Sequence, residues 1–200
     1  MPFTPYHWGP ALLVGLALPM LFDLPAFMVA SVILDLEPFF VLFFNVQGYP
    51  VHAFFHSYLG ASSLALLSIG MVVSLENPLR AIMQVFRLPR KPSFRRIVFS
   101  SFIGVYLHVF LDSFLYPDLT PFYPLQGNIF VNLLPADQSS AIIYGFSGIA
   151  GILGIAVYWY RLLRESRAKE KQMKTEQEQA KKLTTSGEDN LGEEVEKKDE

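Results

Sequence analysis

The sequence contains no cysteine among its 200 residues. This absence excludes a disulfide framework, a thiolate metal site and a cysteine nucleophile. Lysine and arginine are also missing before Arg80 and between residues 97 and 160. With a formal net charge of −2, the chain shows nothing that favours nucleic-acid binding.

Long apolar segments make up the body of the chain, and the charge gathers at its C-terminal end. Residues 161–200 hold 10 of the 16 basic and 11 of the 18 acidic residues. An apolar stretch of about 20 residues can cross the hydrocarbon core of a membrane as a helix. The pattern predicts an all-α, polytopic membrane bundle over residues 1–160, with five spans at residues 8–22, 25–44, 52–75, 97–116 and 138–160.

The remaining segments are predicted from their charge and proline content. Residues 76–96 contain an amphipathic stretch that we expect to lie on the membrane surface. Residues 117–137, rich in proline and aromatic side chains, are expected to form a loop. Residues 161–200 are expected to be a cytoplasmic helical extension that becomes disordered after about Thr184.

The first segment does not have the pattern of a signal peptide, because it has no basic residue and is interrupted by Pro2, Pro5 and Pro10. We expect it to stay in the mature protein as a membrane helix. Pro38 should break or kink the second span at that position.

The basic residues predict the orientation. All six that precede residue 160 lie in residues 80–96, and the next cluster starts at Arg161. The positive-inside rule places both in the cytoplasm. Five spans then give a multi-pass protein of the cell membrane, with its N-terminus extracytoplasmic and its C-terminus cytoplasmic. In this topology, every histidine and every acid inside the predicted spans falls in the outer half of the bilayer, namely His7, His52, His56, His108, Asp35, Glu37 and Asp112.

His108 and Asp112 are four residues apart in a predicted span, so they share one helix face. Two ionisable groups in an apolar segment need a partner inside the protein. A metal ion satisfies a neutral imidazole and a carboxylate together, and a helix-packing hydrogen bond is an equal alternative for the pair alone. His52 and His56 form a second pair with this spacing; an interfacial histidine pair is the alternative, and which of the two binds metal stays open.

Asp35 and Glu37 are two residues apart and do not share a helix face. Asp35 is favoured as a ligand, since we expect it on the regular helix before Pro38. Glu37 is expected to orient a ligand or to act as a general base, with a structural helix cap as the alternative. One metal site at the outer ends of the spans, including His7, explains every histidine in the chain, so we favour it over separate structural roles.

These residues carry a resemblance to a known family. The chain has a histidine, then Asp35-Leu-Glu37 at a helix break, then His52-Ala-Phe-Phe-His56-Ser57, and then His108-Val-Phe-Leu-Asp112 followed by Thr120-Pro121. This order resembles the YdjM-like membrane-bound metal-dependent hydrolases. The opening Met1-Pro-Phe-Thr-Pro-Tyr-His7 is similar to a related family of uncharacterised prokaryotic membrane proteins. The resemblance covers about residues 1–125.

The resemblance implies a metal centre and a hydrolytic activity. Its wider group is thought to be related to the helical zinc-dependent phospholipase C fold. It implies that His7, Asp35, His56, His108 and Asp112 are ligands, with His52 matching the first histidine of its motif and Asp112 bridging two metals. Because no histidine follows His108, one or two ions are implied rather than three. Zinc fits these ligands best, with Mn²⁺ as the lesser option.

The leading functional hypothesis is a membrane-embedded metal-dependent hydrolase of phosphate esters or lipids on the extracytoplasmic side. Water activated by the metal would be the nucleophile, and Asp112, Asp35 or Glu37 would accept its proton. The alternative is a non-catalytic, metal-stabilised scaffold or sensor, whose charged tail would bind a cytoplasmic protein. An ion or proton carrier ranks lowest, because the ionisable groups form no continuous line across the bilayer.

Overall fold

The structure, a computed structural model, describes residues 5–88 and 90–196, and these residues are helical or irregular, with no strand among them. The chain divides into two compact units, Met1–Tyr158 and Trp159–Glu200. The predicted all-α class is confirmed. The helices are α1 (Trp8–Ala17), α2 (Leu24–Ala30), α3 (Leu36–Phe43), α4 (Tyr58–Ser74), α5 (Glu76–Val85), α6 (Phe94–Asp112) and α7 (Ser139–Glu196), with three short 3-10 helices, η1 (Pro5–His7), η2 (Ile33–Asp35) and η3 (Phe54–His56).

Three helical segments of the described chain are long and apolar enough to cross a membrane, namely Leu24–Phe43, Phe94–Asp112 and Ser139–Gln179. Helices α4 and α5 make a fourth if they are taken as one span, although the chain bends by 75° between them. Helix α1 has only 10 residues. At 1.5 Å per residue it is about 15 Å long, roughly half the hydrocarbon thickness. The structure therefore supports three to four candidate spans, and the count of five stays a prediction.

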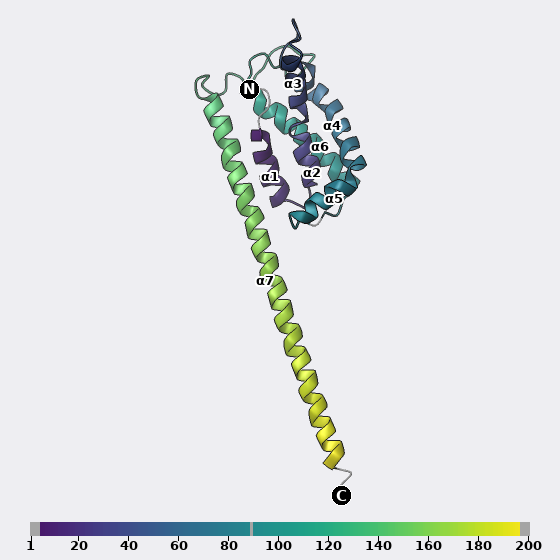
Figure 1. The fold of residues 1–200 in the computed structure, drawn as a ribbon. Coiled ribbons are helices and arrows are strands. Elements are labelled where there is room, and N and C mark those ends of the chain that lie inside the picture. Colours follow the sequence, from purple (N-terminus) through teal and green to yellow (C-terminus); the bar gives the residue numbers. More distant parts are fainter. Residues whose placement is uncertain (1–4, 89, 197–200) are drawn as a thin grey trace. The chain divides into compact units, whose positions relative to one another are not determined.

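Helix α6 is the centre of the first unit. It packs against both α2 and α4, and α1 packs against α2 (Figure 1). Gly104 permits this close approach, because a Cβ at that position would lie 2.7 Å from the Ala30 Cβ and 3.0 Å from the Phe27 carbonyl oxygen. The contact sets the next turn of α6, which carries His108, against the end of α2.

The second predicted span is broken, but the break precedes Pro38 instead of falling at it. Helix α2 ends at Ala30, and Pro38 lies in the first turn of α3. Proline fits a first turn because its missing N–H has no helical partner there, whereas in a continuous helix its ring would clash with the carbonyl of residue 34. The expectation that Asp35 lies on the preceding regular helix is also wrong. Asp35 ends η2 and is the N-cap residue of α3.

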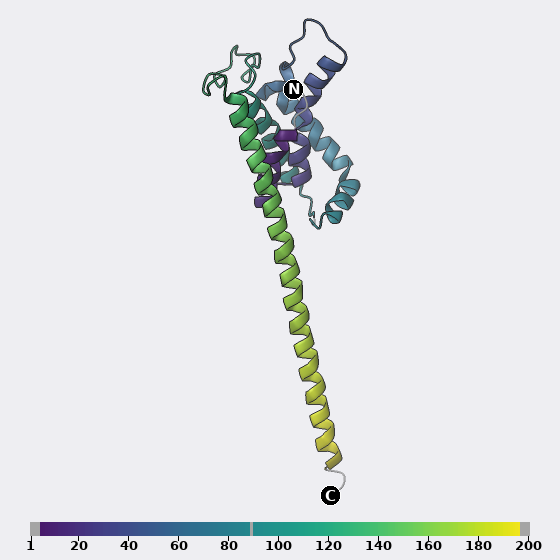
Figure 2. The same cartoon turned by 60° about the vertical axis from the view of Figure 1, so that its left-hand side comes forward.

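The third predicted span also begins later than expected. His52 precedes η3 and His56 ends it, so the two histidines do not share a regular helical turn. Helix α4 starts only at Tyr58, because the Ser57 side chain accepts a hydrogen bond from the Gly60 N–H at 3.0 Å and caps the helix. The loop of residues 44–53 extends from the end of the bundle between α3 and η3 (Figure 2).

The loop of residues 113–138 folds back onto the ends of two helices. The Asn128 side-chain amide donates to the carbonyl oxygens of Ser113 and Tyr116 at 2.8 and 3.1 Å, where α6 has ended. The Tyr58 N–H donates to the Pro121 carbonyl at 2.9 Å, at the start of α4. The loop therefore ties together the ends of α4 and α6 nearest to the candidate ligands.

The predicted amphipathic segment forms α5, whose residues are all at least partly exposed. In the second unit, α7 continues with ion pairs four residues apart, Lys169–Glu165 at 2.7 Å and Lys174–Glu170 at 2.6 Å. Its backbone is helical through Glu196, and the disorder predicted after Thr184 stays a prediction. Extension of an existing helix requires no new nucleation, which favours its continuation into this segment.

A buried ion pair joins the loop before α6 to the start of α2. The Arg90 Nε and Nη2 atoms both donate to the Asp23 carboxylate at 3.0 Å, and both side chains are almost fully buried. The Asp23 carboxylate also caps α2 by accepting from the Ala26 N–H at 3.2 Å. Removal of either partner would leave the other charge buried and unpaired.

We therefore expect Arg90→Ala to lower the free energy of unfolding by about 3–5 kcal/mol. Arg80→Ala is the matched control, because Arg80 pairs with Glu76 at the surface and an exposed pair is worth at most about 1 kcal/mol. Denaturant unfolding in detergent measures both variants. If both variants lose the same small amount of unfolding free energy, the buried Arg90–Asp23 pair does not stabilise the loop before α6.

Candidate metal centre

The structure brings all seven candidate residues into one buried region of the first unit. They come from η1, η2, the start of α3, the residues before α4, and α6. None of them is more than 8% exposed. They are His7, Asp35, Glu37, His52, His56, His108 and Asp112. Residues that the sequence separates by up to about 100 positions therefore meet at one end of the bundle.

His108 and Asp112 lie one turn apart on α6, with the His108 Nε2 atom 3.2 Å from Asp112 Oδ2. The His108 Nδ1–H donates to the Ser31 carbonyl at 2.7 Å. This bond fixes the ring and turns Nε2 toward the carboxylates of Asp112 and Asp35, the latter at 3.7 Å. The Nε2 atom is buried and has no well-formed hydrogen bond within the described chain. Its environment is that of a metal-ligating nitrogen.

His56 shows the same arrangement from the other side. Its Nδ1–H donates to Glu37 Oε2 at 2.8 Å, and its Nε2 atom lies 3.8 Å from Asp112 Oδ2. This Nε2 atom is also buried without a hydrogen-bond partner among the described residues. A carboxylate that holds one ring nitrogen while the other faces an ion is a common feature of histidine metal sites.

Both oxygens of Glu37 are engaged in orienting its surroundings. Besides His56, Oε2 accepts from the Ala53 N–H at 3.2 Å. Oε1 accepts from the Phe55 N–H at 3.3 Å and from the Tyr49 hydroxyl at 3.1 Å. Glu37 therefore holds the segment before α4 in place. This geometry favours its orienting role over that of a general base.

His7 completes the centre from the N-terminal side. Its Nε2 atom lies 3.2 Å from Asp112 Oδ1, and its ring stacks on that of His108 with centroids 3.8 Å apart. Burial lowers the pKa of His7, partly opposed by the nearby Asp112 carboxylate. Burial also lowers the pKa of His56, partly opposed by its hydrogen bond to Glu37. Both lowered pKa values favour the neutral imidazole, which is the form that binds a metal.

His52 lies at the more open edge. Its Nδ1 atom is 3.4 Å from Asp118 Oδ2, and its ring stacks on Tyr116 with centroids 3.8 Å apart. Burial and the nearby Asp112 carboxylate raise the pKa of Tyr116, so its hydroxyl stays protonated. The sequence did not point to Asp118, because a carboxylate in an irregular loop shows no periodicity that would relate it to His52.

The candidate ligands form two neighbouring groups, each of which can hold a metal ion. His7, Asp35 and His108 make one group, and the other consists of His52, His56 and Asp112. In each group, the three ligand atoms lie within 4.8 Å of one another. Asp112 belongs to the second group and contacts His7 and His108 of the first.

The distances around Asp112 are compatible with a shared cation. Two ligand atoms bound tetrahedrally at 2.0–2.1 Å lie roughly 3.3 Å apart. Around Asp112, the three histidine nitrogens stand at 3.2, 3.2 and 3.8 Å from its oxygens. A hydrogen bond does not reach the 3.8 Å between His56 Nε2 and Asp112 Oδ2, or the 3.7 Å between His108 Nε2 and Asp35 Oδ1. A cation could be shared by the two atoms of each pair after a small shift. The three buried carboxylates supply the negative charge that such a cation balances.

The fold and the site define a helical protein with three to four candidate spans and a buried histidine–carboxylate centre that can hold a metal ion. Comparison with models of known families, with curated proteins and with solved structures finds no match for the chain. Its own side chains are therefore the basis for the functional interpretation.

The orienting role of Glu37 leads to a testable expectation. Glu37→Gln keeps the size of the side chain but weakens its bond to His56, and we expect a 10- to 100-fold loss of metal affinity, roughly the effect of removing such partners elsewhere. Competition with a chelating dye measures the dissociation constant. Glu76→Gln on the exposed α5 is the control and should bind as the unmodified protein does. An unchanged metal affinity in Glu37→Gln would contradict the role of Glu37 in orienting His56.

Proposed function

We propose that the protein is a membrane-embedded, metal-dependent hydrolase of phosphate esters, with its centre on the extracytoplasmic side. One observation carries the proposal. The buried Nε2 atoms of His56 and His108 both face Asp112 Oδ2 without a hydrogen-bond partner in the described chain, and each ring is fixed through its Nδ1 atom. Such a pair of imidazoles is prepared to bind a cation. The resemblance to YdjM-like hydrolases supports the same function.

The residues divide into distinct roles in this proposal. His7, Asp35 and His108 would hold one ion, His52 and His56 would hold a second, and Asp112 would contribute to both. Zinc is the preferred ion because the ligands are imidazoles and carboxylates, and manganese is the second choice. A bound zinc ion supplies Lewis acidity toward water and toward a phosphoryl oxygen.

Side chains and backbone groups of the chain would accept protons and orient the ligands. Asp35 and Asp112 are the carboxylates near enough to the centre to accept a proton from water. Glu37 and the Ser31 carbonyl keep His56 and His108 oriented. Tyr116, whose ring stacks on His52, would donate its hydroxyl to a substrate oxygen.

The direct test is turnover. Protein loaded with zinc or manganese should hydrolyse bis(p-nitrophenyl) phosphate, and Asp35→Asn should lower kcat by at least about 100-fold. Glu76→Gln provides the control. Metal-loaded protein that hydrolyses neither this diester nor p-nitrophenyl phosphate would contradict the hydrolase proposal and favour the metal-stabilised scaffold or sensor.

The proposed orientation can be tested with cysteine labelling, because the chain has no native cysteine. Gln47 is exposed in the loop after α3, at the end of the bundle that holds the centre. A membrane-impermeant maleimide should label Gln47→Cys in intact cells, and it should label Lys91→Cys only after permeabilisation. The reverse pattern would place the centre in the cytoplasm.

A further inference from the structure

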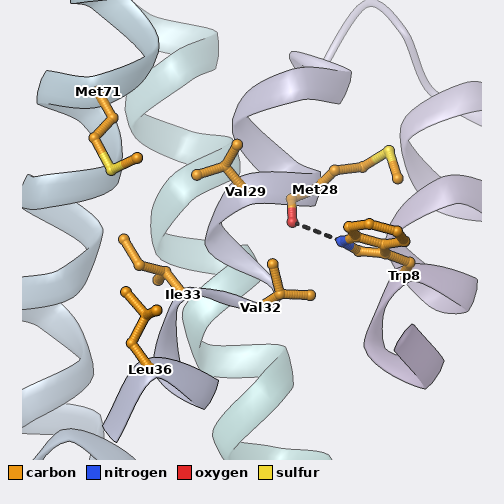
Figure 3. A pocket seen from close by; sticks show the side chains of 7 residues that line it. All are labelled: Trp8, Met28, Val29, Val32, Ile33, Leu36 and Met71. Atoms are coloured by element: carbon orange, nitrogen blue, oxygen red, sulfur yellow. Dashed lines mark hydrogen bonds between the residues drawn. The ribbon is translucent and has the colours of Figure 1, made fainter. Parts of the chain in front are cut away.

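An apolar groove lies beside the break between α2 and α3. It has a volume of about 250 Å³ and is lined by Trp8 of α1, by Met28, Val29 and Val32 around the end of α2, by Leu36 of α3 and by Met71 of α4. Figure 3 shows Trp8 and Met28 on one side and Met71 and Leu36 on the other. The groove lies along Leu24–Phe43, a candidate membrane span, so it opens at the depth of the hydrocarbon core.

The break in the span forms the groove and also holds the centre. In a continuous helix, the Val32 N–H would donate to the Met28 carbonyl. Because α2 ends at Ala30, it donates to the Val29 carbonyl instead, and the Met28 carbonyl is left without its helical donor. That carbonyl instead accepts from the Ser31 hydroxyl at 2.9 Å and from the Trp8 indole N–H at 3.3 Å, which fixes Trp8 as one wall (Figure 3).

The walls of the groove are the direct chain neighbours of the candidate ligands. Trp8 follows His7, and Leu36 follows Asp35. Ser31, whose carbonyl accepts from His108, precedes Val32. Within the segment from Ser31 to Leu36, the Ser31 carbonyl and Asp35 thus face the centre. Val32, Ile33 and Leu36 line the groove.

The size and lining of the groove select its occupant. At interior packing density its volume accommodates roughly ten methylene groups. The lining offers no polar partner beyond the Trp8 N–H, which is already bonded. A single hydrocarbon chain fits both conditions.

We propose that this groove binds an acyl chain of a membrane lipid whose phosphate ester reaches the metal centre. This inference rests on the proposed function for its headgroup chemistry, and it names the substrate class as a long-chain phospholipid that enters from within the membrane. The groove would then select for chain length, because each methylene packed against its walls adds van der Waals contacts.

Two measurements test the inference separately from hydrolysis. The first uses phosphatidylglycerol in nanodiscs with a diazirine at the end of one acyl chain, followed by mass spectrometry of the labelled peptides. We expect the label to concentrate on the groove residues of α2 and α4, and Met71→Trp to abolish it there. Leu66→Trp is the control, because Leu66 is exposed on another face of α4. If the label is spread evenly over the apolar surface and Met71→Trp does not change it, the proposal that the groove binds an acyl chain is contradicted.

The second measurement compares substrates. Met71→Trp should lower the turnover of long-chain phosphatidylglycerol by about tenfold or more relative to that of bis(p-nitrophenyl) phosphate, and Leu66→Trp should leave this ratio as it is in the unmodified protein. Equal turnover of the lipid by Met71→Trp and Leu66→Trp would also contradict the inference. If metal-loaded protein hydrolyses neither substrate, the proposed function fails, and the labelling pattern alone still decides whether the groove binds the chain.

Discussion

His108→Ala should abolish metal binding while the helical fold persists. His108 supplies a buried Nε2 atom that faces both Asp35 and Asp112, and no other residue of the described chain can replace it at that position. We expect the metal content to fall below about one tenth of that of the unmodified protein, since loss of a direct ligand should weaken binding more than the 10- to 100-fold that loss of a ligand's supporting partner costs. Turnover should fall with it.

Leu107→Ala is the matched control for this variant, because Leu107 is the preceding residue of α6 and packs against an apolar cluster instead of the centre. Circular dichroism reports whether each variant keeps its helices, and inductively coupled plasma mass spectrometry reports the metal. A folded His108→Ala variant that keeps the full metal content would contradict the assignment of His108 as a ligand.

Removal of the metal should destabilise the protein. Without a cation, the carboxylates of Asp35, Asp112 and Glu37 are buried close together in an apolar bundle. A ligand present at about a thousandfold its dissociation constant stabilises the folded state by about 4 kcal/mol. For a chain of this size, we expect chelation to lower Tm by about 10 °C.

The chelation effect should depend on the centre itself. Scanning fluorimetry of the purified protein with and without o-phenanthroline measures it, and added zinc should restore the original Tm. Asp112→Asn should show a low Tm that neither chelator nor zinc changes, because Asp112 contacts His7, His56 and His108. A Tm that responds equally in this variant would mean that zinc acts elsewhere.

The spacing of His108 and Asp112 could be interpreted from the sequence because both lie on one regular helix. Four residues on α6 bring their side chains to 3.2 Å, as the helical period requires. The charge pattern also placed the histidines at one depth, and the structure gathers them at one end of the bundle. Helical periodicity and charge distribution are properties of the sequence alone.

Other parts of the centre could not be predicted from periodicity or charge in the sequence. The Ser31 carbonyl that orients His108 is a backbone group, and any residue at that position would supply it. It lies there because α2 stops at Ala30, well before α3 begins at Leu36. The close approach of α6 to α2 depends on Gly104, whose partner could not be identified before the helices were placed.

The segment before α4 shows the same limit. The spacing of His52 and His56 suggested one helical turn, but the Ser57 cap starts the helix after both. Their rings still meet, with centroids 5.0 Å apart, because Glu37 fixes His56 from across the bundle. The two rings are therefore brought together by tertiary contacts, which a single sequence does not show, and not by a shared helical turn.

The central claim is that the buried histidines and carboxylates bind a metal, and X-ray absorption spectroscopy of the purified protein tests it most directly. After loading with zinc and removal of excess ion, we predict one or two bound equivalents, with a first coordination sphere of nitrogen and oxygen at about 2.0–2.1 Å. Protein that retains no stoichiometric metal after loading with either zinc or manganese would contradict the claim.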